Sequence, residues 1–198
     1  NRDEPMLGPI FGVDPRLTLR WSPVKGGTLK AGSGLYNQPP QPFEAWRPTG
    51  EVLLGFERAW SSELGWEQQI GAAVHADAAV FYKDLDDLIV QNTDFNDIDS
   101  QYFTNSGIGR IYGAEFMLRH ALIDKFFGWI SYTLSRSERN DAPNAPVDVD
   151  DYADPSQAPD SNWYLFDFDQ THILVALAGY RLPRDFEVSA KIQYVTGN

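Results

Sequence analysis

The chain has no cysteine, no long apolar run and no surplus of basic charge. The absence of cysteine from its 198 residues excludes disulfides, thiolate nucleophiles and cysteine-based metal sites. No apolar stretch approaches the ~18 residues that a membrane-spanning helix needs. The formal net charge of -12 argues against nucleic acid as a partner, because phosphate repels a polyanion. It also argues against adhesion to an anionic cytoplasmic leaflet.

Aromatic residues, in contrast, are abundant at 14% of the chain, with 6 Trp, 9 Tyr and 12 Phe. Such side chains collect in protein cores, at interfaces and at membrane–water boundaries. The hydrophobic share of 42% and the charged share of 22% suit an ordinary globular domain. The order of the residues must therefore decide where the aromatic side chains lie.

The main signal in that order is an alternation of apolar and polar residues, which is typical of β-strands. It is clearest over 186–194, where Phe186, Val188 and Ala190 share one face and Glu187 and Ser189 the other. The same pattern covers residues 16–21, 60–67, 112–119 and 126–135, and with less contrast 28–36, 73–90 and 171–182. This makes about eight antiparallel strands, each long enough to cross a bilayer.

The links between these strands alternate in length. Short links fall at 23–27, 69–72, 121–125 and 183–185, and long, acidic links fall at 37–57, 91–105 and 137–170. Outer-membrane barrels combine tight periplasmic turns with extended outer loops in this way. A soluble β-sandwich that binds through loops at one end is the alternative.

The hydrocarbon of a membrane contains no water that could hydrogen-bond a backbone amide. Strands can therefore cross it only as a closed barrel, in which each strand pairs with a neighbour on both sides. One face of each strand then meets lipid and the other meets the lumen, where charged side chains stay hydrated or paired. The charged residues predicted to face the lumen are Arg16, Arg20, Glu63, Glu67, Glu187 and Lys191. The aromatic residues predicted to form girdles near strand ends are Trp21, Tyr36, Trp60, Trp66, Tyr132, Tyr180 and Tyr194. In a sandwich, these rings would fill the core instead.

Short sequence pieces also follow one another in the order of a known family. They include Gly34-Leu35-Tyr36-Asn37-Gln38-Pro39-Pro40, Asn105-Ser106-Gly107, Tyr112-Gly113-Ala114-Glu115, Ser131-Tyr132-Thr133-Leu134-Ser135 and Phe168-Asp169-Gln170-Thr171-His172. Across nearly its whole length the chain resembles the C-terminal half of the barrel of TonB-dependent outer-membrane receptors. The resemblance implies an all-β fold, an antiparallel up-and-down transmembrane β-barrel segment.

The resemblance further implies that residues 1–198 are one partial barrel domain, about eight strands of a barrel of roughly 22 with a plugged lumen. The plug domain is not in this stretch, and both ends read as cuts from a longer chain. The implied location is the outer membrane of a Gram-negative bacterium, in contact with its lipid. The implied role is TonB-energised uptake, through the plug, of a metal chelate such as a siderophore, cobalamin or an oligosaccharide. No enzymatic activity and no cofactor are expected. A secreted, carbohydrate-binding β-sandwich is the alternative function.

Ligand contacts are expected in the long outer links. Pro39-Pro40-Gln41-Pro42-Phe43 reads as a rigid, polyproline-like segment that carries Phe43 and Trp46. It either contacts a ligand at the receptor mouth or stiffly covers the rim. Carboxylates recur at short spacing in the last long link, at Asp148, Asp150, Asp151 and Asp154. They form either a weak Ca²⁺ site or a solvated acidic loop, because the central Gly and terminal Glu of an EF-hand are missing.

Other residue types that carry chemistry have simpler interpretations. His75, His120 and His172 lack metal-ligand spacing, and the resemblance favours a structural place for His172 near the top of a strand. The glycine pairs at 32–34 and 107–109 precede no helix, so they indicate bends in a curved sheet rather than phosphate loops. No catalytic residue is predicted.

Overall fold

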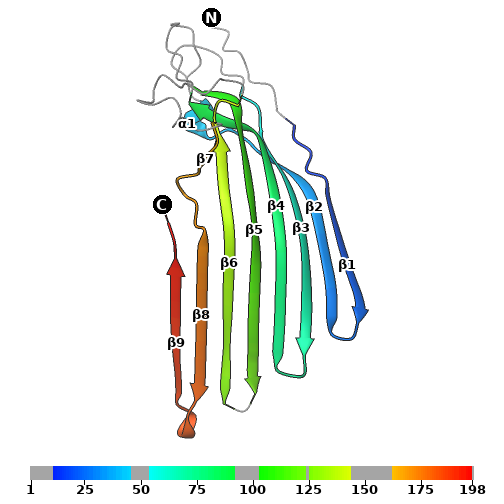
Figure 1. Ribbon diagram of the computed structural model, residues 1–198, viewed down its shortest axis with the longest axis vertical. Coiled ribbons are helices and arrows are strands. Elements are labelled where there is room, and N and C mark those ends of the chain that lie inside the picture. Colours follow the sequence, from blue (N-terminus) through cyan, green and yellow to red (C-terminus); the bar gives the residue numbers. More distant parts are fainter. Residues whose placement is uncertain (1–10, 46–53, 92–102, 124, 144–161, 198) are drawn as a thin grey trace, which may run out of the picture.

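The described part of the protein is one antiparallel β-sheet. The computed structural model describes residues 11–45, 54–91, 103–123, 125–143 and 162–197. Figure 1 shows long, side-by-side strands joined by tight turns at the lower end. The strands are β1 (Arg16–Val24), β2 (Gly27–Gln38), β3 (Glu57–Ile70), β4 (Val74–Gln91), β5 (Phe103–Ile123), β6 (Phe126–Asn140), β7 (Tyr164–Leu165), β8 (His172–Arg181) and β9 (Glu187–Val195). The all-β, antiparallel prediction is confirmed.

The strands follow one another through space as they do along the chain. Their order is β1-β2-β3-β4-β5-β6-β8-β9, and the short β7 pairs with the upper end of β6. All described strands belong to this single sheet, so the alternative of a two-sheet sandwich is wrong. Within the described residues, no helix is long and apolar enough to cross a membrane.

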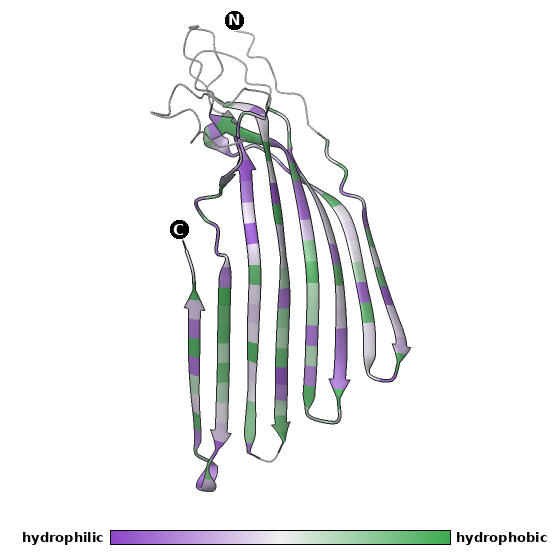
Figure 2. Cartoon of the chain, viewed as in Figure 1, coloured by the Kyte–Doolittle hydropathy of each residue, from purple (hydrophilic) through white to green (hydrophobic). Residues whose placement is uncertain are grey.

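The register of the strands sorts side chains onto two faces. Leu64 on β3 lies opposite Val80 on β4, which in turn lies opposite Ala114 on β5. Leu64 and Val80 are 50% and 54% exposed, although both are large and apolar. Figure 2 shows the alternation of hydrophobic and hydrophilic residues along the strands that produces this apolar face. A continuous exposed apolar surface of this kind marks a membrane or protein contact.

The sheet has almost no core of its own. The buried apolar side chains of the described residues are Leu54, Ala79, Leu85 and Leu88. Leu85 and Leu88 lie near the upper end of β4, beside a bulge where Asp87 has a φ of 56°. The structure therefore rests on backbone pairing between strands and on what covers the two faces, rather than on a packed interior.

Several strands are longer than the alternation indicated. β2 continues to Gln38, β5 begins at Phe103 and β6 continues to Asn140. The residues added to β2 and β6 are polar on both faces, and those added to β5 include Thr, Asn, Ser and Gly at 104–107, so the alternation fades although the backbone pairing continues. Tyr132 consequently lies near the middle of β6 and not near its end, which corrects its predicted place. The two-residue β7 is too short to leave a pattern and was not predicted.

The short links are turns with left-handed backbone at defined positions. Gly26 and Gly71 have φ values of 73° and 61°, a conformation that glycine adopts without steric cost. The 3₁₀ turn at Pro183–Asp185 places Arg184 and Asp185 in the same region, at 64° and 60°. The amide of Gln69 donates to the carbonyl of Gly26 at 2.7 Å, which ties the first turn to the lower end of β3.

We expect Gly128→Ala to destabilise the sheet by about 1–3 kcal/mol, the usual cost of overpacking. A Cβ at Gly128 would lie 2.6 Å from the carbonyl oxygen of Leu177, on the paired strand β8. The control is Gly32→Ala, whose Cβ would first meet Thr18 Cγ2 at 3.9 Å. Urea unfolding in detergent, followed by circular dichroism, compares the two. Equal midpoints would contradict this account of the β6–β8 contact.

Candidate functional site

A network of charged side chains crosses four strands on the polar face. The Lys30 ammonium on β2 lies 2.9 Å from Glu67 Oε1 on β3 and 2.9 Å from Asp77 Oδ2 on β4. Arg20 on β1 reaches the other oxygen of Glu67, also at 2.9 Å. We call Arg20, Lys30, Glu67 and Asp77 the charge ladder. The predicted common face of Arg20 and Glu67 is confirmed by their ion pair.

Three ligand-type side chains lie together at this ladder. Single donor atoms of Glu67, His75 and Asp77 are within 4.8 Å of one another. The Lys30 ammonium, however, already contacts both carboxylates. A metal ion at these atoms would have to displace that ammonium. No such grouping of the described residues includes His120 or His172.

His172 begins β8 and makes hydrogen bonds through both its side chain and its backbone. Its Nδ1 lies 2.8 Å from the hydroxyl of Tyr132, and the two rings stack with centroids 6.2 Å apart. Its backbone amide donates to Thr196 Oγ1 at 2.8 Å. His172 thus joins β6, β8 and the residue after β9. These contacts agree with a structural place near the top of its strand.

The upper end of β6 holds a buried carboxylate that the sequence did not single out. Glu138 is 7% exposed and accepts hydrogen bonds from Arg110 Nε at 2.6 Å and Arg136 Nε at 2.7 Å. The Arg110 guanidinium also covers the ring of Trp163 at 4.5 Å. Asp169, 4% exposed, accepts from the amide of Ser137 at 2.7 Å. Together these contacts fasten the segment before β8 against β6.

Tyr164 completes the attachment of that segment. Its hydroxyl donates to Asp141 Oδ2 at 2.9 Å. Burial, together with this hydrogen bond to a carboxylate, raises the pKa of Tyr164 to about 12. The protonated phenol is therefore the form that the folded protein favours.

Two other long connections are tied together at their bases by Asn105. Its Nδ2 donates to the carbonyl of Asp87 at 2.8 Å, and its Oδ1 accepts from the amide of Gly55 at 2.7 Å. Asp87 also pairs with Arg58, and Glu57 accepts from the amide of Ile89 at 3.0 Å. The outer ends of β3, β4 and β5 are thereby held in one arrangement, above which the long connections begin.

Of the predicted ligand contacts, only Phe43 lies within the described residues. It belongs to the one-turn helix α1 (Pro42–Ala45), so the polyproline-like prediction is wrong at this point. Its ring is 67% exposed and meets Phe103, the first residue of β5, edge to face at 6.3 Å. Trp46, Asp148, Asp150, Asp151 and Asp154 lie outside the described residues.

A family model described as "TonB dependent receptor-like, beta-barrel" matches residues 9–197. The chain belongs to this family. TonB-dependent receptors are outer-membrane proteins of Gram-negative bacteria and not enzymes, so both of these predictions agree with the family. The apolar face of the sheet therefore meets lipid, and the polar face with its charge ladder lines the lumen. Comparison with curated proteins finds no match.

Three solved structures share the fold. The FrpB iron transporter from Neisseria meningitidis (F3-3 variant) has a TM-score of 0.68 and 13% identity, over 92% of this chain and 26% of that one. The ferric-catecholate import receptor Fiu from K12 E. coli has a TM-score of 0.64 and 18% identity, over 91% of this chain and 24% of that one. The alcaligin outer-membrane receptor FauA from Bordetella pertussis has a TM-score of 0.62 and 15% identity, over 93% of this chain and 29% of that one. This chain thus spans about a quarter of the proteins it matches.

We expect Lys30→Met to destabilise the barrel by about 1–2 kcal/mol, between the values for surface and buried ion pairs. Without the ammonium, Glu67 and Asp77 face each other as direct partners across β3 and β4. Urea unfolding of the full-length receptor gives the difference. Adding Asp77→Asn to the Lys30→Met variant is expected to recover most of the lost stability. The control is Lys191→Met, at an exposed position of β9 on the same face. Equal losses from both lysine variants would contradict the ladder.

We expect Tyr164 to titrate near pH 12, and we expect this titration to be absent from the Tyr164→Phe variant. Because the folded pKa is raised above the ordinary value of 10.0, the stabilisation is complete below pH 10. It is then lost as the pH rises from 10 through about 12. Absorbance at the tyrosinate band, taken as wild type minus variant, isolates this group. A difference curve centred at pH 10 would contradict the contact with Asp141.

Proposed function

We propose that this chain forms part of an outer-membrane receptor that takes up a scarce ligand by active transport. The energy would come from TonB, acting on a plug domain held inside the barrel. The observation that carries the proposal is the family match over residues 9–197 on a sheet with one apolar face and one charged face. No covalent step is needed, since the ligand only has to be bound and released.

A chelate of iron is the ligand class that we favour among metal chelates, cobalamin and oligosaccharides. The similar structures are described as an iron transporter, a ferric-catecholate import receptor and an alcaligin receptor. Their identities of 13–18% support a common fold, and the ligand is carried over as part of this proposal.

The sheet would contribute a rigid frame to such a receptor. The Asn105 contacts and the Glu138 contacts fix the places where the long connections leave the strands. Phe43 and Trp46 would contact the ligand from the first of these connections. Exposed aromatic rings at a receptor mouth suit this role, because they offer apolar area at low entropic cost.

The acidic residues Asp148, Asp150, Asp151 and Asp154 are the second set of proposed contacts. Their carboxylate spacing suits weak Ca²⁺ binding that orders the connection between β6 and β7. Limited proteolysis of the receptor with and without Ca²⁺ tests this. Cleavage at the same rate between residues 144 and 161 in both conditions would contradict it.

Uptake by whole cells tests the function itself. Cells that depend on this receptor are expected to accumulate radioactive iron from a ferric chelate. A protonophore should stop accumulation while surface binding continues, because binding precedes energised release. Cells lacking the inner-membrane TonB protein should behave like the protonophore-treated cells. Accumulation that survives both treatments would exclude TonB-energised transport.

We expect Phe43→Ala to weaken binding of the transported chelate by about fivefold to tenfold, the loss of one aromatic contact. The matched control is Phe186→Ala, because Phe186 is 65% exposed against 67% for Phe43 but lies at the opposite end of the strands. Binding to the purified full-length receptor is measured by tryptophan fluorescence. Identical affinities for the two variants would remove Phe43 from the list of ligand contacts.

A further inference from the structure

The lipid-facing side of the sheet carries a trough that the transport function does not use. Three register rows define it across β5, β6, β8 and β9. The middle row is His120–Gly128–Ala178–Ala190, which is small along most of its length. One row towards the upper end of the strands is Leu118–Ile130–Ala176–Ile192, and one row towards the turns is Phe126–Tyr180–Val188. The middle row of small side chains is therefore flanked on both sides by rows of larger side chains.

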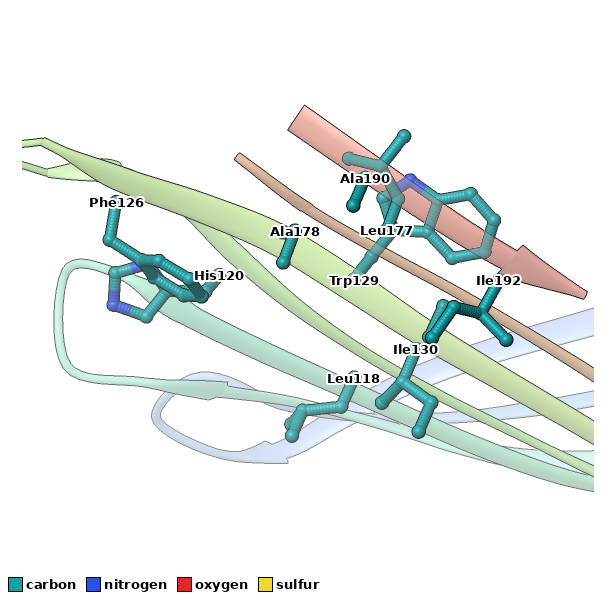
Figure 3. A pocket seen from close by; sticks show the side chains of 11 residues that line it. Leu118, His120, Phe126, Trp129, Ile130, Leu177, Ala178, Ala190 and Ile192 are labelled. Atoms are coloured by element: carbon teal, nitrogen blue, oxygen red, sulfur yellow. The ribbon is translucent and has the colours of Figure 1, made fainter. Parts of the chain in front are cut away.

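The trough is a depression with two rings at one end. It has a volume of about 340 Å³, and its lining is almost entirely apolar. At Gly128 the floor is backbone, because Leu177 O lies 2.6 Å from where a Cβ would be. Figure 3 shows His120 and Phe126 together at one end, with Ile130 and Ile192 apart from them. The two end rings meet edge to face at 5.3 Å.

We propose that this trough binds one acyl chain of a phospholipid in the periplasmic leaflet. The trough is continuous with the apolar face that the family places in lipid. His120 stands close to the short link between β5 and β6, and short links are the periplasmic turns of such barrels. The trough therefore opens at the depth where chains of the inner leaflet lie.

The width of the trough favours a hydrocarbon chain over a protein segment. The bulky rows are four residues apart along each strand, or roughly 13 Å. Their side chains fill much of that distance, so the remaining gap is about as wide as one hydrocarbon chain. An α-helix with side chains is roughly 10–12 Å across and does not enter such a gap. The trough is wider at Ala176, whose side chain is smaller than those of Ile130 and Ile192 on either side. A flexible chain can adapt to this change in width.

One end of the trough holds a polar side chain. His120 Nδ1 is shielded from solvent and has no hydrogen-bond partner among the described residues. A chain that lies along the middle row has one of its ends beside this imidazole. Ala31, on the outward face of β2 between the larger Leu19 and Leu64, offers a matched position that does not line this trough.

Native mass spectrometry of the full-length receptor tests the proposal. The receptor in detergent is incubated with dipalmitoyl phosphatidylglycerol, or with the ethanolamine lipid that has the same chains. One lipid is expected to remain bound with either headgroup. The double variant Ala178→Leu, Ala190→Leu fills the trough and should lower retention by at least about tenfold, equal to roughly two buried methylenes. Ala31→Leu should stay within about twofold of wild type.

Retention unchanged by the filled trough would overturn the proposal. So would retention of only one of the two lipids, which would indicate a headgroup site. If the receptor forms a dimer and the double variant abolishes that dimer, the occupant of the trough would be a second copy of the receptor instead of a lipid. In case the double variant does not fold, a phosphatidylglycerol with a photoreactive acyl chain is applied to the unchanged receptor. Crosslinks are expected on β6, β8 and β9, and an even spread over all outward strands would refute the site.

The inference rests on the position of the sheet in the outer membrane and not on any transported ligand. Uptake and lipid retention are separate measurements, so either can fail alone.

Discussion

A backbone amide in hydrocarbon has no solvent partner, and everything else in this structure depends on satisfying it within the sheet. Each inner strand, from β2 to β8, pairs with a neighbour on both sides, apart from the short β7. This pairing replaces the packed interior of a soluble domain, which explains why so few apolar side chains are buried. It also leaves both faces of the sheet free to be adapted to different surroundings.

The two faces solve two different problems with the same alternation. Towards lipid, exposed Leu64 and Val80 cost nothing, because hydrocarbon covers them. Towards the lumen, charges are kept but are paired, as the charge ladder shows with two cations against two carboxylates. At the upper ends the strands leave the lipid, and there buried Glu138 and Asp169 hold the connections by hydrogen bonds. The trough on the outer face arises because the middle register row is small.

The strands, their order and their two faces could be read from the sequence because they depend on neighbours two residues apart. β8 gave less contrast since Ile173, Val175 and Leu177 make its lumen side apolar as well. The contacts that fix the connections could not be read in this way. Asn105 meets Gly55 across fifty positions, and Glu138 meets Arg110 across twenty-eight. Glu138 and Asp169 lie in the long acidic link read from the sequence, and only the fold brings their partners near them.

The sequence by itself determined the fold class, the lipid and lumen faces, and the family, because period-two alternation and ordered family motifs are properties of the chain alone. The tertiary structure decided which charges pair, that Lys30 contacts both Glu67 and Asp77, and that Phe43 belongs to a helical turn. It also decided where the outer face is hollow. The charge pairs and the hollow depend on register, since a shift of one residue between two strands would place the side chains of a strand on the opposite face.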